Sequence, residues 1–461
     1  MAAGVTGGHR AGRIAAVAAL LACAVTLIFG YLNKARCAGA PFDADGRSLS
    51  FDRIKDAEVC YSDIQFLWLG RGINEHLFPY LSGGITPDGT LTGGAVEYPV
   101  LSGLLMWLGA AGATDDAAFL LHSALLLAPF ALLTAWMLGR MSGPVALLWS
   151  VGPPLILYAF HNWELPVVCT AVGAVYVMTV PTRLSLRTRG IVAAVLLGIG
   201  FCLKLYPGIF VLPLLLYVLL GEPTAADDDP DAGSAPGARP GYDVRGAVLT
   251  AGAAVATVVA INLPFAIFGY EGWRASFAFQ QMRQADITTN SIWYWGLRPM
   301  FESGQDGEAS FQEVVSTASP VLVFAAFALA IWLGWRRFPV LGYYPWVGVS
   351  AAMLCGFLLF HKVHSPQYTL WILPFFVLLE VPWTAVGAYL LADLALGVGV
   401  FRYFYALGSG TAADLDERVV QFGVWGRAIL LVFFFFAFAR ARPRGYLPTV
   451  SPRSRELVPA R

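Results

Sequence analysis

The stretch IAAVAALLACAVTLIFGY, residues 14–31, decides the fold class of this chain. It contains no charged side chain, and it is long enough to cross the hydrocarbon core of a bilayer as a helix. Arg10 and Arg13 precede it, and the apolar run continues well past Cys23. This pattern predicts an uncleaved membrane anchor rather than a cleaved signal peptide.

The composition of the whole chain supports the same class. Of the 461 residues, 57% are hydrophobic and only 13% are charged, whereas about a quarter of the residues in soluble domains carry charge. The net charge is zero, and the basic residues stand in short clusters between apolar runs, which argues against nucleic acid as a partner. The sequence therefore predicts an all-α polytopic membrane protein that contacts membrane lipids.

The basic clusters orient the predicted helices, because short cytoplasmic loops are enriched in Lys and Arg. The clusters are Arg10 and Arg13, Arg140, residues 183–189, Arg336 and Arg337, and residues 440–444. Placing all of them inside gives about twelve spans and puts both termini in the cytoplasm. The predicted spans are 14–31, 117–139, 143–160, 165–181, 190–204, 206–221, 246–268, 317–335, 341–360, 367–382, 384–401 and 423–440.

These spans form one predicted domain, 1–440, followed by a disordered cytoplasmic tail at 441–461. The long outer loops are 32–116 and 269–316. Within the first, residues 98–111 are too few for a comfortable span, so we expect a re-entrant or interfacial helix there. Residues 222–244 include three consecutive aspartates and lack apolar periodicity, which predicts a disordered cytoplasmic linker.

Asp63, in the first outer loop, is the leading candidate for chemistry. The spacing of Ser62 and Gln65 around it fits a capping box, so Asp63 would lie in the first turn of a short interfacial helix. The helix dipole favours an ionised carboxylate in that position. Such a group at the membrane surface can accept the proton of an attacking hydroxyl. A solvated aspartate at a helix start is the alternative interpretation.

Cationic side chains gather on the same predicted face. Arg71, Arg283, Lys362 and His364 fall at or near the outer boundary, where they could stabilise charge on a phosphate leaving group. Snorkelling or contact with lipid headgroups is an equal alternative for the two arginines. Lys204 separates two apolar runs, which is a costly place for a charge without a partner.

Three further outer segments have two interpretations each. Residues 161–164 lie between two spans, offer Glu164 as a second acid, and include a tryptophan that could belong to an interfacial belt. The loop 269–316 interleaves aromatics with amides, which suits sugar recognition and equally suits a loop on the bilayer interface. His361 and His364 could share a helix face, but no cysteine or carboxylate accompanies them, so neither a metal site nor a cofactor is predicted.

The order and outer placement of these motifs resemble the GT-C glycosyltransferases, most closely the polyprenol-phosphate-mannose-dependent α-mannosyltransferases that include the phosphatidylinositol-mannoside enzymes. The matching motifs are Tyr61-Ser62-Asp63, Arg71-Gly72, Pro79-Tyr80, Glu97-Tyr98-Pro99, Asn162-Trp163-Glu164, Lys204-Leu205-Tyr206-Pro207, Asn290-Ser291 and His364-Ser365-Pro366-Gln367-Tyr368. The resemblance covers roughly residues 10–440. It departs from the family at the acidic linker and at Glu164, where an aspartate is expected.

The resemblance implies a GT-C-like bundle in which Asp63 is the general base and a polyprenyl-phosphate sugar, usually mannose, is the donor. It implies that Lys204, Arg283, Lys362 and His364 hold the donor phosphate. The substrate contacts that we expect with it are Arg71, Glu97, Tyr98, His161, Asn162, Glu164, Asn290 and Gln367.

The sequence therefore predicts an inverting glycosyltransferase acting on a lipid or glycan acceptor at the outer face of the cell membrane. A transporter or flippase of a lipid-linked or small polar substrate is the first alternative, and a non-catalytic scaffold is the second. The donated sugar, mannose, arabinofuranose or another, stays open, as do the acceptor, the linkage and the oligomeric state. Cys37 and Cys60 share the first outer loop, and whether they form a disulfide is open as well.

Overall fold

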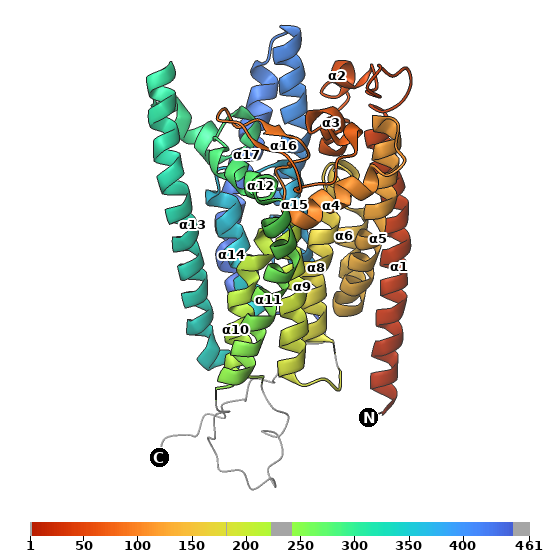
Figure 1. The fold of residues 1–461 in the computed structure, drawn as a ribbon. Coiled ribbons are helices and arrows are strands. Elements are labelled where there is room, and N and C mark those ends of the chain that lie inside the picture. Colours follow the sequence, from red (N-terminus) through yellow and green to blue (C-terminus); the bar gives the residue numbers. More distant parts are fainter. Residues whose placement is uncertain (1, 181, 223–241, 446–461) are drawn as a thin grey trace, which may run out of the picture.

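The computed structural model describes residues 2–180, 182–222 and 242–445, and this part of the chain folds as an elongated bundle of helices (Figure 1). The bundle helices are α1 (Ala2–Ala35), α5 (Asp116–Ser142), α6 (Leu147–Val151), α7 (Pro153–Tyr158), α8 (Glu164–Thr179), α9 (Leu186–Leu203), α10 (Val211–Leu220), α11 (Val244–Phe268), α13 (Gln305–Leu341), α14 (Trp346–Phe360), α15 (Thr369–Leu378), α16 (Trp383–Ser409) and α17 (Asp414–Arg440). The fold class is all-α, as the composition predicts.

In the described part of the chain, seven apolar helical stretches are long enough to cross a membrane, by their length and composition. They are Gly12–Ala35, Asp116–Val151, Leu186–Leu203, Val244–Phe268, Gln305–Leu341, Trp383–Ser409 and Asp414–Arg440. Helices such as α8, α14 and α15 are apolar but shorter. A multi-pass membrane protein follows from these lengths, whereas the count of twelve spans stays a prediction. The predicted linker and tail fall largely on residues 223–241 and 446–461, outside the described residues.

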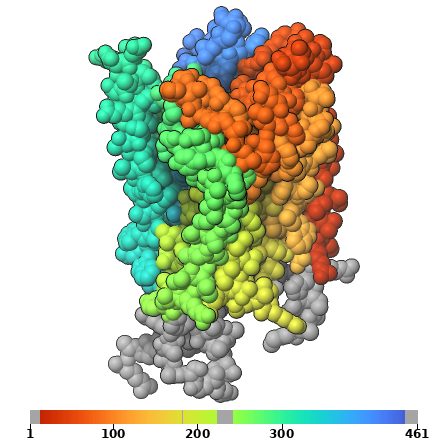
Figure 2. Space-filling view, in the orientation of Figure 1, coloured from red at the N-terminus to blue at the C-terminus, as the bar shows by residue number. Residues whose placement is uncertain are grey.

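One end of the bundle carries the short elements, and we call it the upper end, as it lies in Figure 1. These elements are α2 (Phe51–Ile54), α3 (Asp63–Gly70), α4 (Val100–Gly109), α12 (Tyr270–Met282) and the two antiparallel strands β1 (Gly84–Ile85) and β2 (Leu91–Thr92), in which Gly84 pairs with Thr92. Single turns at Ile73–Glu75, Ile287–Thr289, Trp293–Leu297, Arg298–Met300 and Pro366–Tyr368 complete it. Figure 2 shows the segment between α1 and α4, in red-orange and orange, lying over part of this end.

Small residues let the long helices approach closely, as is usual in membrane bundles. A Cβ at Gly139 of α5 would lie 2.5 Å from the Cα of Ala16 in α1. One at Gly423 of α17 would lie 2.6 Å from the Cβ of Leu396 in α16. Larger side chains at these glycines would therefore push α5 away from α1 and α17 away from α16.

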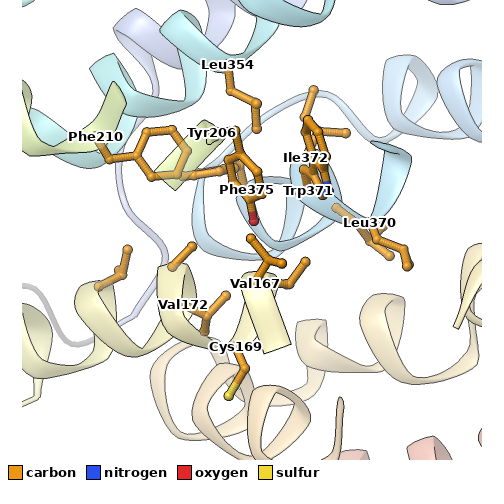
Figure 3. Packing of buried hydrophobic residues seen from close by; sticks show 14 of the residues in the cluster. Val167, Cys169, Val172, Tyr206, Phe210, Leu354, Leu370, Trp371, Ile372 and Phe375 are labelled. Atoms are coloured by element: carbon orange, nitrogen blue, oxygen red, sulfur yellow. The ribbon is translucent and has the colours of Figure 1, made fainter. Parts of the chain in front are cut away.

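Aromatic side chains fill the core below the upper end. Figure 3 shows Tyr206, Phe210, Trp371 and Phe375 packed above Val167 and its neighbours on α8. The rings of Tyr206 and Trp371 stack with their centroids 4.4 Å apart. This apolar layer supports the polar residues that lie above it.

The capping box predicted around Asp63 is wrong, although Asp63 does open α3. The hydroxyl of Ser62 donates to the carbonyl of Phe160 (2.7 Å) and makes no cap to α3. The amide of Gln65 donates to the carbonyl of Cys37 (2.8 Å) and to Asp116 Oδ2 (3.0 Å). Both side chains thus make hydrogen bonds to distant parts of the chain in place of the local capping-box hydrogen bonds.

α3 packs on the protein through its apolar face. Ile64, Leu67 and Trp68 are all buried, and the indole ring of Trp68 lies 5.6 Å from the ring of Phe119 in α5. The short helix expected at Asp63 is therefore present, and its residues Leu67 and Trp68 are buried in the protein. The structure fixes the start of α3, and so Asp63, against the bundle.

The structure also describes the other segments of the first and second predicted outer loops. Residues 98–111 form only the ten-residue helix α4, which packs beside α5 and α9, and Ser102 donates to the carbonyl of Leu203 (2.7 Å). The segment 269–316 is largely helical, because α12 fills its first part and α13 already begins at Gln305. Cys37 and Cys60 form a disulfide, which answers the question that their spacing left open.

Candidate functional site

Polar segments that are far apart in the sequence meet at the upper end. The backbone N–H of Asp63 donates to the carbonyl of His161 (2.8 Å), which joins α3 to the turn between α7 and α8. The backbone N–H of His364 donates to the carbonyl of Thr289 (2.7 Å), which joins the turn after α14 to the segment after α12. The fold therefore brings most of the predicted site segments into contact.

Asp63 lies at the centre of a hydrogen-bonded group. Its Oδ1 accepts from the hydroxyl of Tyr61 (2.9 Å), and its Oδ2 accepts from Asn162 Nδ2 (2.7 Å). Asn162 Nδ2 also donates to the hydroxyl oxygen of Tyr98 (2.8 Å). The Asp63 side chain keeps 21% of its surface exposed, so the carboxylate is held in position and is still reachable from outside.

His161 lies beside Asp63 but is buried. Its Nε2 is 3.8 Å from Asp63 Oδ2, and its Nδ1 is buried without a partner among the described residues. Burial lowers the pKa of His161 to about 4, and the nearby carboxylate of Asp63 offsets only part of this effect. His161 is therefore neutral at pH 7 and packs against Asp63 as an uncharged ring.

Glu164 and Lys204 form a buried ion pair, which supplies the partner that the sequence left unknown. Glu164 Oε1 bonds to Lys204 Nζ, and Glu164 Oε2 accepts from the indole N–H of Trp371 (2.5 Å). The ammonium of Lys204 also lies 5.1 Å from the ring centre of Tyr98 and 5.8 Å from that of Tyr368. Glu164 already neutralises the charge of Lys204. The predicted contact of Lys204 with a donor phosphate stays a prediction.

Arg71 and Glu97 form a second pair nearer to the surface. Arg71 Nε lies 2.7 Å from Glu97 Oε2, and Arg71 Nη2 lies 3.1 Å from Glu97 Oε1, so the contact is bidentate. The guanidinium lies over the ring of Phe279, and the side chain of Gln280 donates to the carbonyl of Glu97 (2.8 Å). These contacts tie the first polar segment to α12.

Arg283 and Lys362 form a cationic pair with little compensation. Arg283 donates to the hydroxyl of Thr288 (2.7 Å), and its nearest carboxylate oxygen, on Asp286, is 3.9 Å away. Lys362 donates to the carbonyl of Gln281 (3.3 Å). Burial and then the charge of Arg283 lower the pKa of Lys362. The two positive charges thus repel each other, and an anion bound between them would offset that repulsion.

Three predicted residues are more deeply buried than the sequence suggests. His364 and Gln367 are each 5% exposed, and Asn290 is 3% exposed. His364 Nε2 and Asn290 Oδ1 lack partners among the described residues. Burial lowers the pKa of His364 well below its usual range, and the charge of Arg427 acts in the same direction. His364 is therefore a neutral polar group here rather than a cation.

Sequence reasoning missed several buried charged side chains near the site, among them an ion pair of Arg427 with Asp393 and the lysine Lys34. Arg427 of α17 lies 3.2 Å from Asp393 of α16 and donates to the carbonyl of His364 (2.9 Å). Lys34, in the last turn of α1, donates to the carbonyl of Tyr61 (2.8 Å). A signal was present for the first pair, because charges inside apolar runs are rare and usually paired.

Comparison with known proteins adds little to this picture. No family model and no curated protein matches the chain. Among solved structures, it is similar to ArnT from Cupriavidus metallidurans bound to undecaprenyl phosphate. The sequence identity is 12%, the TM-score is 0.42, and the match covers 91% of this chain and 76% of that chain. A superposition this loose transfers neither an activity nor a substrate.

Proposed function

We propose that this protein is a membrane glycosyltransferase that uses a polyprenyl-phosphate sugar, with mannose the first sugar to test, and a lipid or glycan acceptor. The observation that carries the proposal is the environment of Asp63. Its carboxylate is held by Tyr61 and Asn162 and is partly exposed at the polar end of an otherwise apolar bundle. That is the placement a general base needs for a hydroxyl that arrives at the membrane surface.

In the proposed reaction the acceptor oxygen attacks the anomeric carbon of the donor. A new bond forms between that oxygen and the carbon, and the bond from the carbon to the phosphate oxygen breaks. The acceptor proton moves to a carboxylate oxygen of Asp63, and the bonding electron pair leaves with the polyprenyl phosphate. Direct displacement of this kind inverts the anomeric configuration.

Arg283 and Lys362 are the cations best suited to the departing phosphate. Their mutual repulsion and the 3.9 Å gap to Asp286 leave positive charge available for an anion. Fixed cations that meet charge as it develops stabilise a transition state strongly. Lys204 suits this role less well, because Glu164 neutralises it. We assign it to the support of Tyr98 instead.

The Cys37–Cys60 disulfide supports placing the site on the extracytoplasmic side. It lies in the segment that carries Asp63, and disulfides persist mainly in oxidising compartments. The basic clusters in the short loops favour the same orientation, with both termini in the cytoplasm. A donor in the outer leaflet would then reach the site with its lipid tail still in the bilayer.

The experiment is transfer of a radiolabelled sugar from polyprenyl phosphate by the purified full-length protein in lipid nanodiscs. Asp63→Asn keeps the size of the side chain but removes the base, so we expect at least a hundredfold loss of kcat. Asp88→Asn is the matched control, because Asp88 lies in the same polar segment and is exposed, with hydrogen bonds to local threonines. It should transfer at the wild-type rate.

Two outcomes would count against the proposal. Equal transfer by Asp63→Asn and wild type would remove Asp63 from the role of base. Wild-type protein that transfers no sugar from mannosyl or arabinosyl carriers, yet moves them across vesicle membranes, would favour a transporter.

A further inference from the structure

Lys34 is a buried lysine that the proposed reaction does not use. It lies in the last turn of α1 and is only 1% exposed. An ammonium has three N–H donors, and the one hydrogen bond that Lys34 makes to the described residues goes to the carbonyl of Tyr61 (2.8 Å).

Burying this charge does not benefit stability by itself. An unpaired buried cation costs several kcal/mol, and replacing buried charges by apolar groups of similar size is often neutral or stabilising. A methionine or leucine in this position would continue the apolar face of α1. The lysine is therefore better explained by what its hydrogen bond holds.

Tyr61 connects Lys34 to Asp63. Its carbonyl accepts from Lys34, and its hydroxyl donates to Asp63 Oδ1 (2.9 Å). Its ring packs among other aromatic rings, with centroids 5.6 Å from Phe401 and 5.5 Å from His161. The backbone carbonyl and the side-chain hydroxyl of Tyr61 thus connect the end of α1 to the carboxylate of Asp63.

The Cys37–Cys60 disulfide keeps these groups together. Cys37 follows Lys34 by one turn of chain, and Cys60 directly precedes Tyr61. The bridge therefore fixes the end of α1 beside the residue that Lys34 binds. Cys37 also accepts through its carbonyl from Gln65 of α3 (2.8 Å), so α3, which begins at Asp63, is tied to the same place.

We propose that Lys34 is a positioning residue for Asp63 and acts through Tyr61. The inference rests on the proposed function of Asp63 as the base. Lys34 fixes the backbone of Tyr61, and Tyr61 then presents its hydroxyl to Oδ1, which leaves Oδ2 oriented by Asn162. Loss of the lysine lets Tyr61 shift, and small displacements of catalytic groups cost up to about a hundredfold in rate.

The test compares Lys34→Met, Tyr61→Phe and the double variant in the nanodisc transfer assay. We expect Lys34→Met to lower kcat by about 10- to 100-fold, with the KM for donor and acceptor changed less than threefold (about the scatter expected of unrelated changes). Tyr61→Phe should do the same. If the lysine acts through the tyrosine hydroxyl, the double variant should lose no more than the worse single variant.

Arg36→Gln is the matched control. Arg36 lies two residues further along, is 47% exposed and pairs with Glu58 (3.4 Å), so its loss should leave kcat unchanged. The melting temperature of Lys34→Met in detergent should equal or exceed that of wild type, since a buried charge is replaced by an apolar side chain. A lower melting temperature with a matching loss of kcat would mean that Lys34 is merely structural and would overturn the proposal.

The outcomes separate this inference from the function on which it rests. Full activity of Lys34→Met, with Asp63→Asn inactive, rejects the positioning role alone. Losses that add in the double variant show that Lys34 does not act through Tyr61. Wild-type protein without transferase activity rejects both proposals together.

Discussion

Asp63 and His161 lie side by side, but their surroundings differ. The Asp63 side chain is 21% exposed and accepts two hydrogen bonds, whereas that of His161 is 6% exposed and has a buried Nδ1 without a partner among the described residues. The carboxylate is thus accessible from outside, while the imidazole is a buried, uncharged packing group. Protonation of His161 would place a charge in this buried position.

The lowered pKa of His161 predicts acid sensitivity of the fold. The pKa is about 4 in the folded protein against the usual 6.5, so the unfolded chain binds a proton that the folded one rejects. Stability is therefore fully present above about pH 6.5 and falls as the pH drops towards 4, by up to about 3 kcal/mol. Melting temperatures in detergent from pH 7 to 5 should fall less steeply for His161→Gln than for wild type. Parallel curves would contradict this prediction.

Two arginines, one in α12 and one just after it, provide a test of donor binding. A charge-assisted bond to phosphate contributes about 1.5–3 kcal/mol, so Arg283→Gln should raise the donor KM by about 10- to 100-fold (1.4 kcal/mol for each tenfold). Arg274 lies on the same helix, is 60% exposed and pairs only with Glu271 (3.6 Å). Arg274→Gln should leave the donor KM unchanged. Equal KM values for both variants would remove Arg283 from the phosphate site.

At the scale of helices, the Glu164–Lys204 pair joins three elements below the site. Glu164 opens α8, Lys204 ends α9, and Trp371 belongs to α15. Trp371 also stacks on Tyr206 in the aromatic cluster of Figure 3, with the ring centroids 4.4 Å apart. The Lys204 ammonium lies over the Tyr98 ring, and the Tyr98 hydroxyl accepts from Asn162, so the pair supports this ring.

Breaking this pair should destabilise the protein more than removing it. Glu164→Leu or Lys204→Met leaves one buried charge unpaired, which costs about 3–5 kcal/mol. The double variant leaves neither charge, so its melting temperature in detergent should recover most of the loss. A double variant that melts as low as the worse single variant would mean that the pair has a role that apolar packing cannot replace.

The sequence predicted correctly those elements whose structure depends mainly on one property, such as an uninterrupted apolar run. The apolar run at 14–31 lies inside α1, because an uninterrupted apolar stretch of that length has few alternatives to a helix. Asp63 opens a helix as expected. In contrast, Ser62 and Gln65 bond to Phe160, Cys37 and Asp116 instead of to each other, because tertiary partners compete with the local cap.

For the site residues, the sequence predicted the shared location but not the individual contacts. Their order along the chain predicted that they share one end of the bundle, and contacts such as that of Asp63 with His161 agree. Their pairing was not predictable, because the partner of Lys204 comes from another helix. Lys34 was missed since a lysine at the end of an apolar helix usually snorkels towards water, and only the fold over it shows that it is buried.

At the scale of the whole molecule, the candidate site of the described residues lies at one end of the bundle. α1 begins and α17 ends at the opposite end, while the site contacts all lie at the upper end (Figure 1). This polarity is what a lipid-linked substrate requires, because the bilayer holds its tail beside the bundle and its head at one surface. For the proposed reaction, the direction in which the upper end faces therefore decides which leaflet would supply the donor.

Cysteine labelling in intact cells tests that direction. The cysteines of the described residues are either buried, as Cys23, Cys169, Cys202 and Cys355 are, or joined in the Cys37–Cys60 disulfide, so a membrane-impermeant thiol reagent has little native background. Thr90→Cys places an exposed thiol at the upper end, and Thr182→Cys places one at the opposite end. If the basic clusters are cytoplasmic, the first variant should be labelled in intact cells and the second only after lysis. The reverse pattern would put Asp63 on the cytoplasmic side, where an outer-leaflet donor cannot reach it.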